Sequence, residues 1–488
     1  MANYRSPGVY VEEIALLPPS IAEVESAVPA FVGYTEKAML NTADDLRYVP
    51  TRITSFRDYV EYFGGAHKEV SGAFDIKVIE SKNGAVTTGF KVTITKALPD
   101  LTSKHNLYFA IKHFYANGGG SCYITSVGDY AAAVDLANLT KGLDAVGNED
   151  APTLLSVPEA IYLNTIADYT DIIQQMQTQA STLKDRFALL DTYKTTSPKN
   201  TSSVEIDAKT ATENVLGDGN IRRYGAVYFP FLETTYKYEC DFDTFKIKTH
   251  TIIDNGTPPA TPPPTPLPPD TLLGSIKSTA SAMYNAIKAE FEKYHVILPP
   301  SAAIAGIITR VDNERGFWKA PANVSVANVV KPLVSVSRSE HDLLNINSNN
   351  GRSVNAILNM PGYGTVVMGA RTLDGNDNEW KYINVRRFFS IVEESIKKST
   401  NWVIFEPNNA STWTKVQAMI ENYLFNKWRD GALQGAKPEQ AYFVNVGLNK
   451  TMNSVDILEG RLIVEIGMAV ARPAEFIILR FEHKLQVS

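Results

Sequence analysis

Cysteine is scarce in this sequence, and its histidines do not cluster. The 488 residues include two cysteines, Cys122 and Cys240, which are far apart and outside any CxxC motif. That usage is typical of ordinary thiols in a reducing compartment rather than of a disulfide framework. The seven histidines form neither an HxH nor an HExxH motif, the patterns expected of a metal site. We therefore expect no metal and no other cofactor.

A basic excess and a long apolar run are also missing. The chain has 47 basic and 53 acidic residues, so nothing in its charge indicates nucleic-acid binding. The apolar run at 302–308 is broken by Thr309, well short of the roughly 18 residues of a membrane span. Arg5 and Glu12 interrupt the segment where a secretory signal would need an apolar stretch. These absences predict a protein made in the cytoplasm, with no nucleic-acid partner and no direct membrane insertion.

The composition is that of a globular protein with more than one core. Hydrophobic residues make up 44% of the chain and charged residues 20%. A chain of 488 residues is too long for one ordinary hydrophobic core. We expect two or three domains.

Strands and helices alternate through much of the chain. Nearly all-apolar strands are expected at 27–35, 186–193 and 224–233, and helices at 55–65 and 165–179. The segment 107–128 is expected to form a helix, a glycine turn and a strand, and 151–160 a strand followed by the start of a helix. Apolar strands that alternate with helices predict a parallel sheet covered on both faces. The segment 74–96 differs, because its β-rich runs flank an Asn-Gly pair, which predicts a hairpin.

The chain begins and ends in strand-like segments. A short extended run follows Pro7, from Val9 to Ile14. Near the other end, the runs 460–470 and 474–488 alternate apolar and polar residues, after a strand-to-helix segment at 379–399 and an amphipathic helix at 411–433. A terminal strand leaves backbone groups unpaired unless it joins a sheet edge, so both ends need a partner strand.

A proline-rich stretch lies at 256–270 and holds eight of the chain's 26 prolines. This composition predicts an extended, polyproline-type loop. We interpret the loop as a stiff surface excursion, and a ligand for a peptide-binding domain is the alternative.

Three motifs have a functional and a purely structural interpretation. The run NGGGS at 117–121 lacks the Lys-Ser/Thr of a phosphate loop, so we interpret it as a tight helix-to-strand turn. The run GYGTVVMGA at 362–370 misses the dinucleotide spacing, and we interpret it as a turn followed by a close-packed strand. The charged segment 309–323 could be a catalytic loop. We instead expect its Arg310, Asp312 and Arg315 to form a buried ion-pair network that fixes the loop.

Ten segments in order, spread over nearly the whole chain, carry a specific pattern. They are YRSPGVYVEE (4–13), AFVG (30–33), FYANGGGSCYI (114–124), YFPF (228–231), LPPSAAIAGIITRVDNERGFWKAPAN (298–323), LNIN (344–347), GARTL (369–373), YINVRRFFSIVEESI (382–396), WRDGALQG (428–435) and ILEGRLIVEIGMAVARPAEFIILRF (457–481). Together they resemble the sheath proteins of contractile phage tails and related contractile injection systems.

The resemblance implies an α/β fold, mixed α+β overall, built discontinuously. It implies a central α/β domain described as subtilisin-like, a small β-rich insertion, and an α+β C-terminal domain with exchanged terminal strands. The expected division is an N-terminal arm (1–22), the N-terminal part of the core (23–73), the insertion (74–105), the subtilisin-like domain with the proline-rich loop 256–270 (106–358), and the C-terminal assembly domain with its terminal strand (359–488).

The resemblance also implies a function. Such a chain is a structural subunit, not an enzyme, that polymerises helically around an inner tube and contracts to drive the tube through a target envelope. Its partners would be copies of itself, sheath paralogues, an inner tube protein, and baseplate and cap proteins. It would assemble in the cytoplasm and become part of a phage tail or of an extracellular or cell-associated injection particle.

In such sheaths the terminal arms add strands to the sheets of neighbouring subunits. The residues expected to take part in this exchange are Val9, Tyr10, Val11, Glu12, Leu462, Val464, Ile466, Ile477, Leu479 and Phe481. A helix of the C-terminal domain touches the inner tube in the family. The basic residues expected at that contact are Lys397, Lys398, Lys415, Lys427 and Arg429.

Two alternatives remain. Asp191 follows a strand and Ser301 precedes small residues, as in a subtilisin-like hydrolase. The histidines between them are His250, in a loop-like region, and His295, near a helix end, so neither is expected to act as base on the serine. A non-contractile filament or adhesion scaffold is the other alternative, and it would have pairing arms but no shortened state.

Overall fold

The computed structural model describes residues 20–69, 74–96, 105–193, 219–257, 262–346 and 351–475. The chain divides into two compact units. One, here called the core unit, is Glu25–Arg387, and the other, here called the C-terminal unit, joins the residues up to Val24 with those from Phe388 onward. The fold class is mixed α/β with several sheets.

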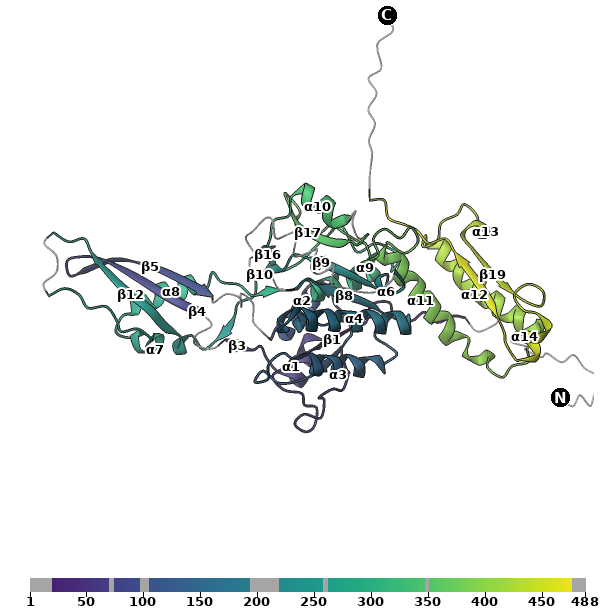
Figure 1. Cartoon of the computed structure of the whole chain (residues 1–488), viewed down its shortest axis with the longest axis horizontal. Coiled ribbons are helices and arrows are strands. Elements are labelled where there is room, and N and C mark those ends of the chain that lie inside the picture. The colour runs from purple at the N-terminus through teal and green to yellow at the C-terminus, as the bar shows by residue number, and fades with distance from the viewer. Residues whose placement is uncertain are drawn as a thin grey trace, which may run out of the picture. The chain divides into compact units, whose positions relative to one another are not determined.

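A nine-stranded sheet organises the core unit (Figure 1). In spatial order its strands are β15 (Val324–Ser325), β18 (Gly364–Val367), β17 (Val354–Met360), β9 (Gly225–Phe229), β8 (Phe187–Asp191), β7 (Leu154–Ser156), β1 (Pro29–Gly33), β6 (Cys122–Ser126) and β2 (Thr51–Ile53). The strands from β17 to β6 are all parallel, and antiparallel neighbours close both edges. The predicted parallel sheet is confirmed.

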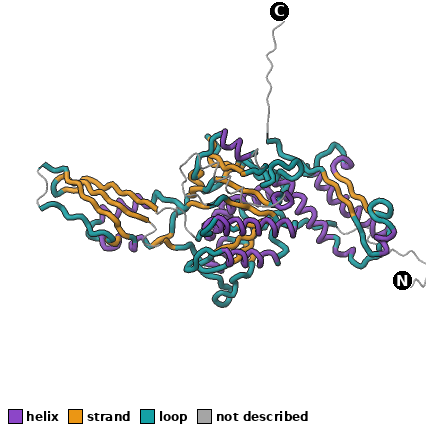
Figure 2. The backbone as a smooth tube through the Cα atoms, in the orientation of Figure 1, coloured by secondary structure: helices purple, strands orange, loops and turns teal. Residues whose placement is uncertain are grey.

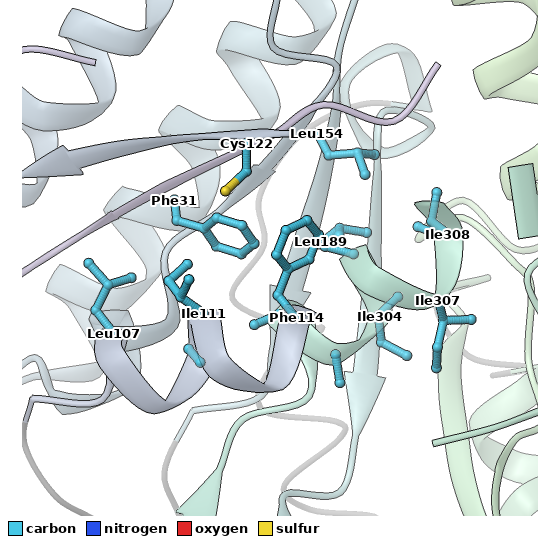
Figure 3. Packing of buried hydrophobic residues seen from close by; sticks show 14 of the residues in the cluster. Phe31, Leu107, Ile111, Phe114, Cys122, Leu154, Leu189, Ile304, Ile307 and Ile308 are labelled. Atoms are coloured by element: carbon cyan, nitrogen blue, oxygen red, sulfur yellow. The ribbon is translucent and has the colours of Figure 1, made fainter. Parts of the chain in front are cut away.

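Helices cover both faces of this sheet. Because side chains alternate along a strand, Val32 of β1 belongs to a cluster with α3 (Leu136–Gly147) and α4 (Ile166–Leu183). Phe31 belongs to the opposite cluster, with α2 (Leu107–Ala116) and α9 (Ser301–Arg315). Figure 3 shows Phe31 beside Phe114, where the ring centroids are 5.3 Å apart.

The local signals in the sequence position several of these elements. The helix α1 (Phe56–Phe63) begins at a capping box formed by Ser55 and Asp58 and ends at Gly64, whose φ is 86°. The predicted hairpin forms from β4 (Phe74–Asn83) and β5 (Val86–Lys96), with Gly84 at φ 64° in its turn. Both predictions are confirmed.

The hairpin belongs to a second, four-stranded sheet. Its order is β13 (Thr271–Leu272), β12 (Lys246–Asp254), β4 and β5, and β12 runs parallel to β4. The helices α7 (Leu273–Ile276) and α8 (Ser281–Phe291) share its hydrophobic cluster. His250 therefore lies in a strand, and the expectation of a loop there was wrong.

Short elements complete the core unit. They are β3 (Lys68–Glu69), β10 (Leu232–Thr234), β11 (Glu239–Cys240), β14 (Ile297–Leu298), β16 (Val329–Pro332), α6 (Gly219–Arg222), α10 (Arg338–Asn345), η1 (Pro158–Tyr162) and η2 (Phe242–Thr244). The segment 362–370 is a turn and a strand, as expected, because Gly362 in the turn and Gly364 at the start of β18 both take positive φ.

The described part of the C-terminal unit consists of helices and the antiparallel strand pair β19–β20 (Figure 2). Its elements are the part of α11 (Ile383–Ser399) from Phe388 onward, η3 (Asn401–Val403), α12 (Ala410–Arg429), α13 (Pro438–Ala441), β19 (Tyr442–Val446), α14 (Ser454–Leu458) and β20 (Val464–Met468). The amphipathic helix predicted at 411–433 is α12, and its Val416, Ile420 and Leu424 are buried as the spacing requires.

Two expected strands are shorter than predicted. Before α11 there is only an isolated bridge between Arg371 and Tyr382. The run 460–470 forms a strand only at Val464–Met468, because Arg461 is held in a turn: its amide donates to the Asp456 carbonyl at 2.8 Å and its guanidinium to the Asp456 carboxylate at 2.7 Å.

Candidate assembly interface

In the part of the C-terminal unit that the structure describes, the sheet formed by β19 and β20 has an unpaired edge along β20. β19 and β20 pair antiparallel, from Tyr442 opposite Met468 to Val446 opposite Val464. Within the described ranges, β20 pairs with no strand other than β19. A two-stranded sheet is marginally stable alone, and an unpaired edge offers backbone N–H and C=O groups to another chain.

An apolar groove of about 760 Å³ lies along β20. Leu462, Val464 and Ile466 line it from the strand side, since residues two apart share a face. Gly460, which follows α14, also lines the groove. The other lining residues come from the end of α11, the segment after it, and α12: Ile396, Thr400, Val403, Ile404, Phe405, Glu406, Asn408, Val416 and Ile420. The structure thus brings together three residues that the sequence analysis expected at an exchanged strand.

Large apolar side chains stand exposed at this groove. Phe405 is fully exposed and Ile404 is 63% exposed. Phe405 also has φ of 70°, a left-handed conformation that is unfavourable for a bulky residue. Exposed apolar groups gathered at a groove are characteristic of a protein interaction site. Phe405 was not expected from the sequence, because IFEP at 404–407 carries no periodic signal.

The other predicted exchange residues are not in the described part of the chain. Val9, Tyr10, Val11 and Glu12 precede residue 20, the first described residue. Ile477, Leu479 and Phe481 follow residue 475, the last described residue.

The predicted basic contacts fall into two groups. Lys397 and Lys398 lie in the last turn of α11, and both pair with Glu394, at 3.1 Å and 3.5 Å. Lys415 and Arg429 are exposed residues of α12. These four side chains reach the surface.

Lys427 is different, because its side chain is only 12% exposed. It forms an ion pair with Glu23, a residue of the same unit that precedes the core. The charge of Lys427 is therefore already engaged in an ion pair within its own chain.

Asp191 and Ser301 do come together in the core unit. The Ser301 hydroxyl donates to Asp191 Oδ2 at 2.5 Å, and the Ser301 amide donates to Asp191 Oδ1 at 2.8 Å. Ser156 donates to the Ser301 hydroxyl at 3.0 Å. All of these groups are buried, and burial raises the pKa of Asp191 to about 7.

Neither candidate histidine is hydrogen-bonded to this serine. His250 Nε2 lies 3.3 Å from a Glu80 carboxylate oxygen, and its Nδ1 accepts the Leu267 amide. His295 lies 3.3 Å from Glu233. The serine donates directly to the aspartate, with no imidazole between them to act as base.

Glu159 is a buried carboxylate that the sequence analysis missed. The strand order reverses at β1, whose neighbours are β6 and β7, and doubly wound sheets bind ligands at such reversals. Here the Glu159 carboxylate lies at the N-terminus of α2. One of its oxygens accepts hydrogen bonds from the amides of Asn106 at 2.8 Å and Leu107 at 3.2 Å. Its other oxygen accepts the Tyr34 amide at 2.6 Å. Burial raises its pKa to about 8.

The buried ion pair expected in 309–323 exists with a different partner. Asp312 pairs with Arg387 through both carboxylate oxygens, at 3.0 Å and 2.5 Å, and both side chains are buried. Arg310 instead donates to the Ser325 carbonyl at 2.9 Å. The network predicted among Arg310, Asp312 and Arg315 was therefore wrong in its partners, because the matching guanidinium comes from 75 residues further along the chain.

The described residues contain neither a metal-binding cluster nor a helix that could span a membrane. No three His, Cys, Asp or Glu side chains in these ranges gather closely enough to hold a metal ion. No described helix combines the length and apolarity that a bilayer crossing requires.

Comparison with known proteins gives a consistent result. A family model described as the phage tail sheath C-terminal domain matches residues 375–484. The tail sheath protein of Enterobacteria phage T4 is 26% identical over 214 residues, which span 42% of this chain and 30% of the phage protein.

Solved structures are similar over nearly the full chain. The anti-feeding prophage helical sheath in its contracted state is 29% identical, with a TM-score of 0.63, and the match covers 99% of this chain and 100% of that one. The sheath of the extracellular contractile injection system PVC in its contracted state is 27% identical, with a TM-score of 0.62, and 99% of each chain is covered. Residues 375–484 thus match the phage tail sheath C-terminal domain, and nearly the whole chain is similar to the sheath proteins of contractile injection systems.

Proposed function

We propose that this protein is the structural subunit of a contractile sheath that polymerises helically around an inner tube and shortens to drive the tube through a target envelope. The observation that carries this proposal is the open edge of β20 beside an exposed apolar groove. Structures of related sheaths are helical assemblies and baseplate complexes, which supports self-association and contact with a baseplate.

The groove is proposed to receive the N-terminal arm of a second copy. In strand addition, backbone hydrogen bonds give affinity and pockets for alternate side chains give specificity. The unpaired edge of β20 supplies the backbone groups, and Leu462, Val464 and Ile466 line the place where apolar side chains of residues 9–14 would lie. The C-terminal strand containing Ile477, Leu479 and Phe481 is proposed to extend the sheet of another neighbour.

Such a contact joins two different surfaces of the same chain. A heterologous contact whose rotation does not close produces an open helix, the symmetry of a sheath. Arms that stay paired while the bodies rotate would let the lattice shorten without losing its connections. Contraction is then a transition from a metastable extended lattice, and it consumes no nucleotide.

The finer architecture is part of the same proposal. The mainly parallel sheet with helices on both faces supports the subtilisin-like description of the core domain. The boundaries 1–22, 23–73, 74–105, 106–358 and 359–488 remain the proposed domains. The β4–β5 hairpin that starts the proposed insertion shares its sheet with β12 and β13.

The inner tube is proposed to meet the basic residues that reach the surface. Lys397, Lys398, Lys415 and Arg429 would face acidic groups of the tube, and Lys427 contributes least because it pairs with Glu23. Cap and baseplate proteins, and sheath paralogues where present, would be the remaining partners. The assembled particle is a phage tail or an extracellular or cell-associated injection system, put together in the cytoplasm.

Electron microscopy of negatively stained protein tests this proposal. The full chain, expressed alone, is compared with a variant that lacks residues 1–20. We expect hollow striated tubes from the full chain and only unassembled protein from the variant. Tubes from both would show that the arm is not the connecting element, and tubes of fixed length under every condition would favour the non-contractile filament.

A further inference from the structure

The chain just before the core lies extended along α11 in the C-terminal unit. The amide of Ala22 donates to the Ser399 hydroxyl at 3.2 Å, and the amide of Val24 donates to the Ser395 hydroxyl at 3.1 Å. Two residues of extended chain advance about 6.7 Å, and four residues of helix advance about 6 Å. The distance between the two serines along α11 thus nearly equals the distance between the amides of Ala22 and Val24. Because the earlier residue, Ala22, contacts the later serine, Ser399, the segment runs antiparallel to the helix.

Ser395 is well placed to accept this hydrogen bond. Its hydroxyl is buried and donates to the Ile391 carbonyl at 2.7 Å, one turn earlier in α11. Because that proton is already used, the oxygen presents its lone pairs to the Val24 amide. Donor and acceptor are both satisfied in a partly buried place, where an unpaired polar group would be costly.

Glu23 points to the other helix, α12. The Tyr423 hydroxyl donates to Glu23 Oε2 at 3.0 Å, and Lys427 forms an ion pair with the same oxygen. Tyr423 and Lys427 are also four residues apart, so they present neighbouring groups on one helix face. Tyr423 is 7% exposed, and the Lys427 side chain is 12% exposed. Charge-assisted hydrogen bonds in such surroundings are stronger than those between neutral groups.

We propose that Glu23 is a positioning residue that anchors the root of the N-terminal arm, residues 22–24, between α11 and α12. The anchor fixes the point from which the arm leaves the C-terminal unit before any neighbour has bound. This inference rests on the proposed function of the arm, and it assigns a role to residues outside the strand that pairs.

The physical benefit of an anchor is preorganisation. A tether whose root is fixed explores less space, so its free end reaches a nearby groove at a higher effective concentration. The arm then loses less conformational entropy when its strand pairs. This raises affinity without any new contact between the two copies. Loss of the anchor should therefore raise the protein concentration needed for assembly while the contacts of the paired strand stay the same.

Hydrogen exchange on the full chain, kept unassembled at low concentration, measures the anchor directly. Glu23→Ala should speed exchange of the Ala22 and Val24 amides by about tenfold or more, the scale expected when hydrogen bonds to a charged group are lost. Glu25→Ala is the matched control. Among the described residues Glu25 forms an exposed ion pair with Arg52 at 2.9 Å, so this variant should leave both amides protected. Tyr423→Phe removes one hydrogen bond and keeps the ring packed, and it should have an intermediate effect.

Assembly of the same variants measures the consequence. We expect Glu23→Ala to need a several-fold higher concentration to form tubes, and Glu25→Ala to behave as the wild type. Unchanged exchange in both Glu23→Ala and Tyr423→Phe would overturn the anchor. Faster exchange with an unchanged assembly threshold would overturn its positioning role. If removal of residues 1–20 leaves assembly intact, the proposed function of the arm fails, and the exchange data still report on the anchor.

Discussion

The hydroxyl of Ser301 donates a 2.5 Å hydrogen bond directly to the carboxylate of Asp191. In a hydrolase with a catalytic triad, an imidazole lies between these two groups and takes the proton of the serine. Here the serine is buried at the start of α9 and also donates its amide to the same carboxylate. The Ser301–Asp191 hydrogen bonds connect the start of α9 to the end of β8, so the role of this pair is structural.

Replacing Ser301 with Ala therefore tests the hydrolase alternative. The exchange removes one hydrogen bond to a buried carboxylate and should lower the free energy of unfolding by about 1 to 3 kcal/mol. Assembly into tubes should be unchanged, and so should any peptidase background measured with a broad peptide mixture. A peptidase activity that is present in the wild type and lost in Ser301→Ala would revive the alternative.

The same carboxylate predicts a pH dependence. Burial raises the folded-state pKa of Asp191 to about 7 from an ordinary value of 3.8, so the folded state binds the proton more tightly than the unfolded chain does. Its contribution to stability is present at low pH and is lost as the pH rises from about 4 through about 7.

Relative to Asp191→Asn, which does not titrate, the wild type should lose a few kcal/mol of stability across that interval, since each pKa unit is worth about 1.4 kcal/mol. Denaturant unfolding at several pH values gives the free energy of unfolding of both proteins. In the difference between the two, the contributions of the other titrating groups cancel. Parallel pH profiles would contradict the assignment.

The groove predicts a face-specific effect within β20. Ile466→Arg places a charge among the apolar lining residues and should abolish tube formation while the protein still folds, because Ile466 is only partly buried. Glu465→Lys is the control, since Glu465 is exposed on the opposite face of the same strand. Sedimentation of assembled material separates the two variants. Equal sedimentation of both would place the interface elsewhere.

The basic surface predicts salt-dependent tube binding. Reversing Lys397 and Lys398 to Glu should weaken association with the inner tube most at low ionic strength, because exposed charges are screened as salt increases. The double variant should fold normally, although it leaves Glu394 without its two ion-pair partners. Co-assembly equal to that of the wild type at every salt concentration would show that the tube contacts another surface.

The sequence predicted local structure well where the signal was local. The parallel strands follow from short apolar runs, and α1 follows from Ser55, Asp58 and Gly64, which define its two ends. The apolar face of α12 follows from the spacing of Val416, Ile420 and Leu424.

Contacts between distant segments were not predictable in the same way. Asp312 pairs with Arg387, and Glu159 accepts hydrogen bonds from amides at the start of α2. The partners are far apart in the chain, and no pattern in a single sequence indicates such pairs. The two serines and the Tyr-Lys pair that hold residues 22–24 are each ordinary in isolation, and only packing brings them to one segment. Similarly, the run 460–470 was expected to be one long strand, and the turn at Arg461 shortened it.

A mixture of two incomplete proteins tests directly whether the arm of one copy pairs with β20 of the next. One lacks residues 1–20 and keeps the groove, and the other carries Ile466→Arg and keeps the arm. If the arm of one copy pairs with β20 of the next, neither protein polymerises alone, and an equimolar mixture forms a complex of one copy of each that cannot grow further. Detection of this one-to-one dimer by analytical ultracentrifugation would support pairing between the arm and β20. A mixture that stays monomeric while the wild type forms tubes would contradict it.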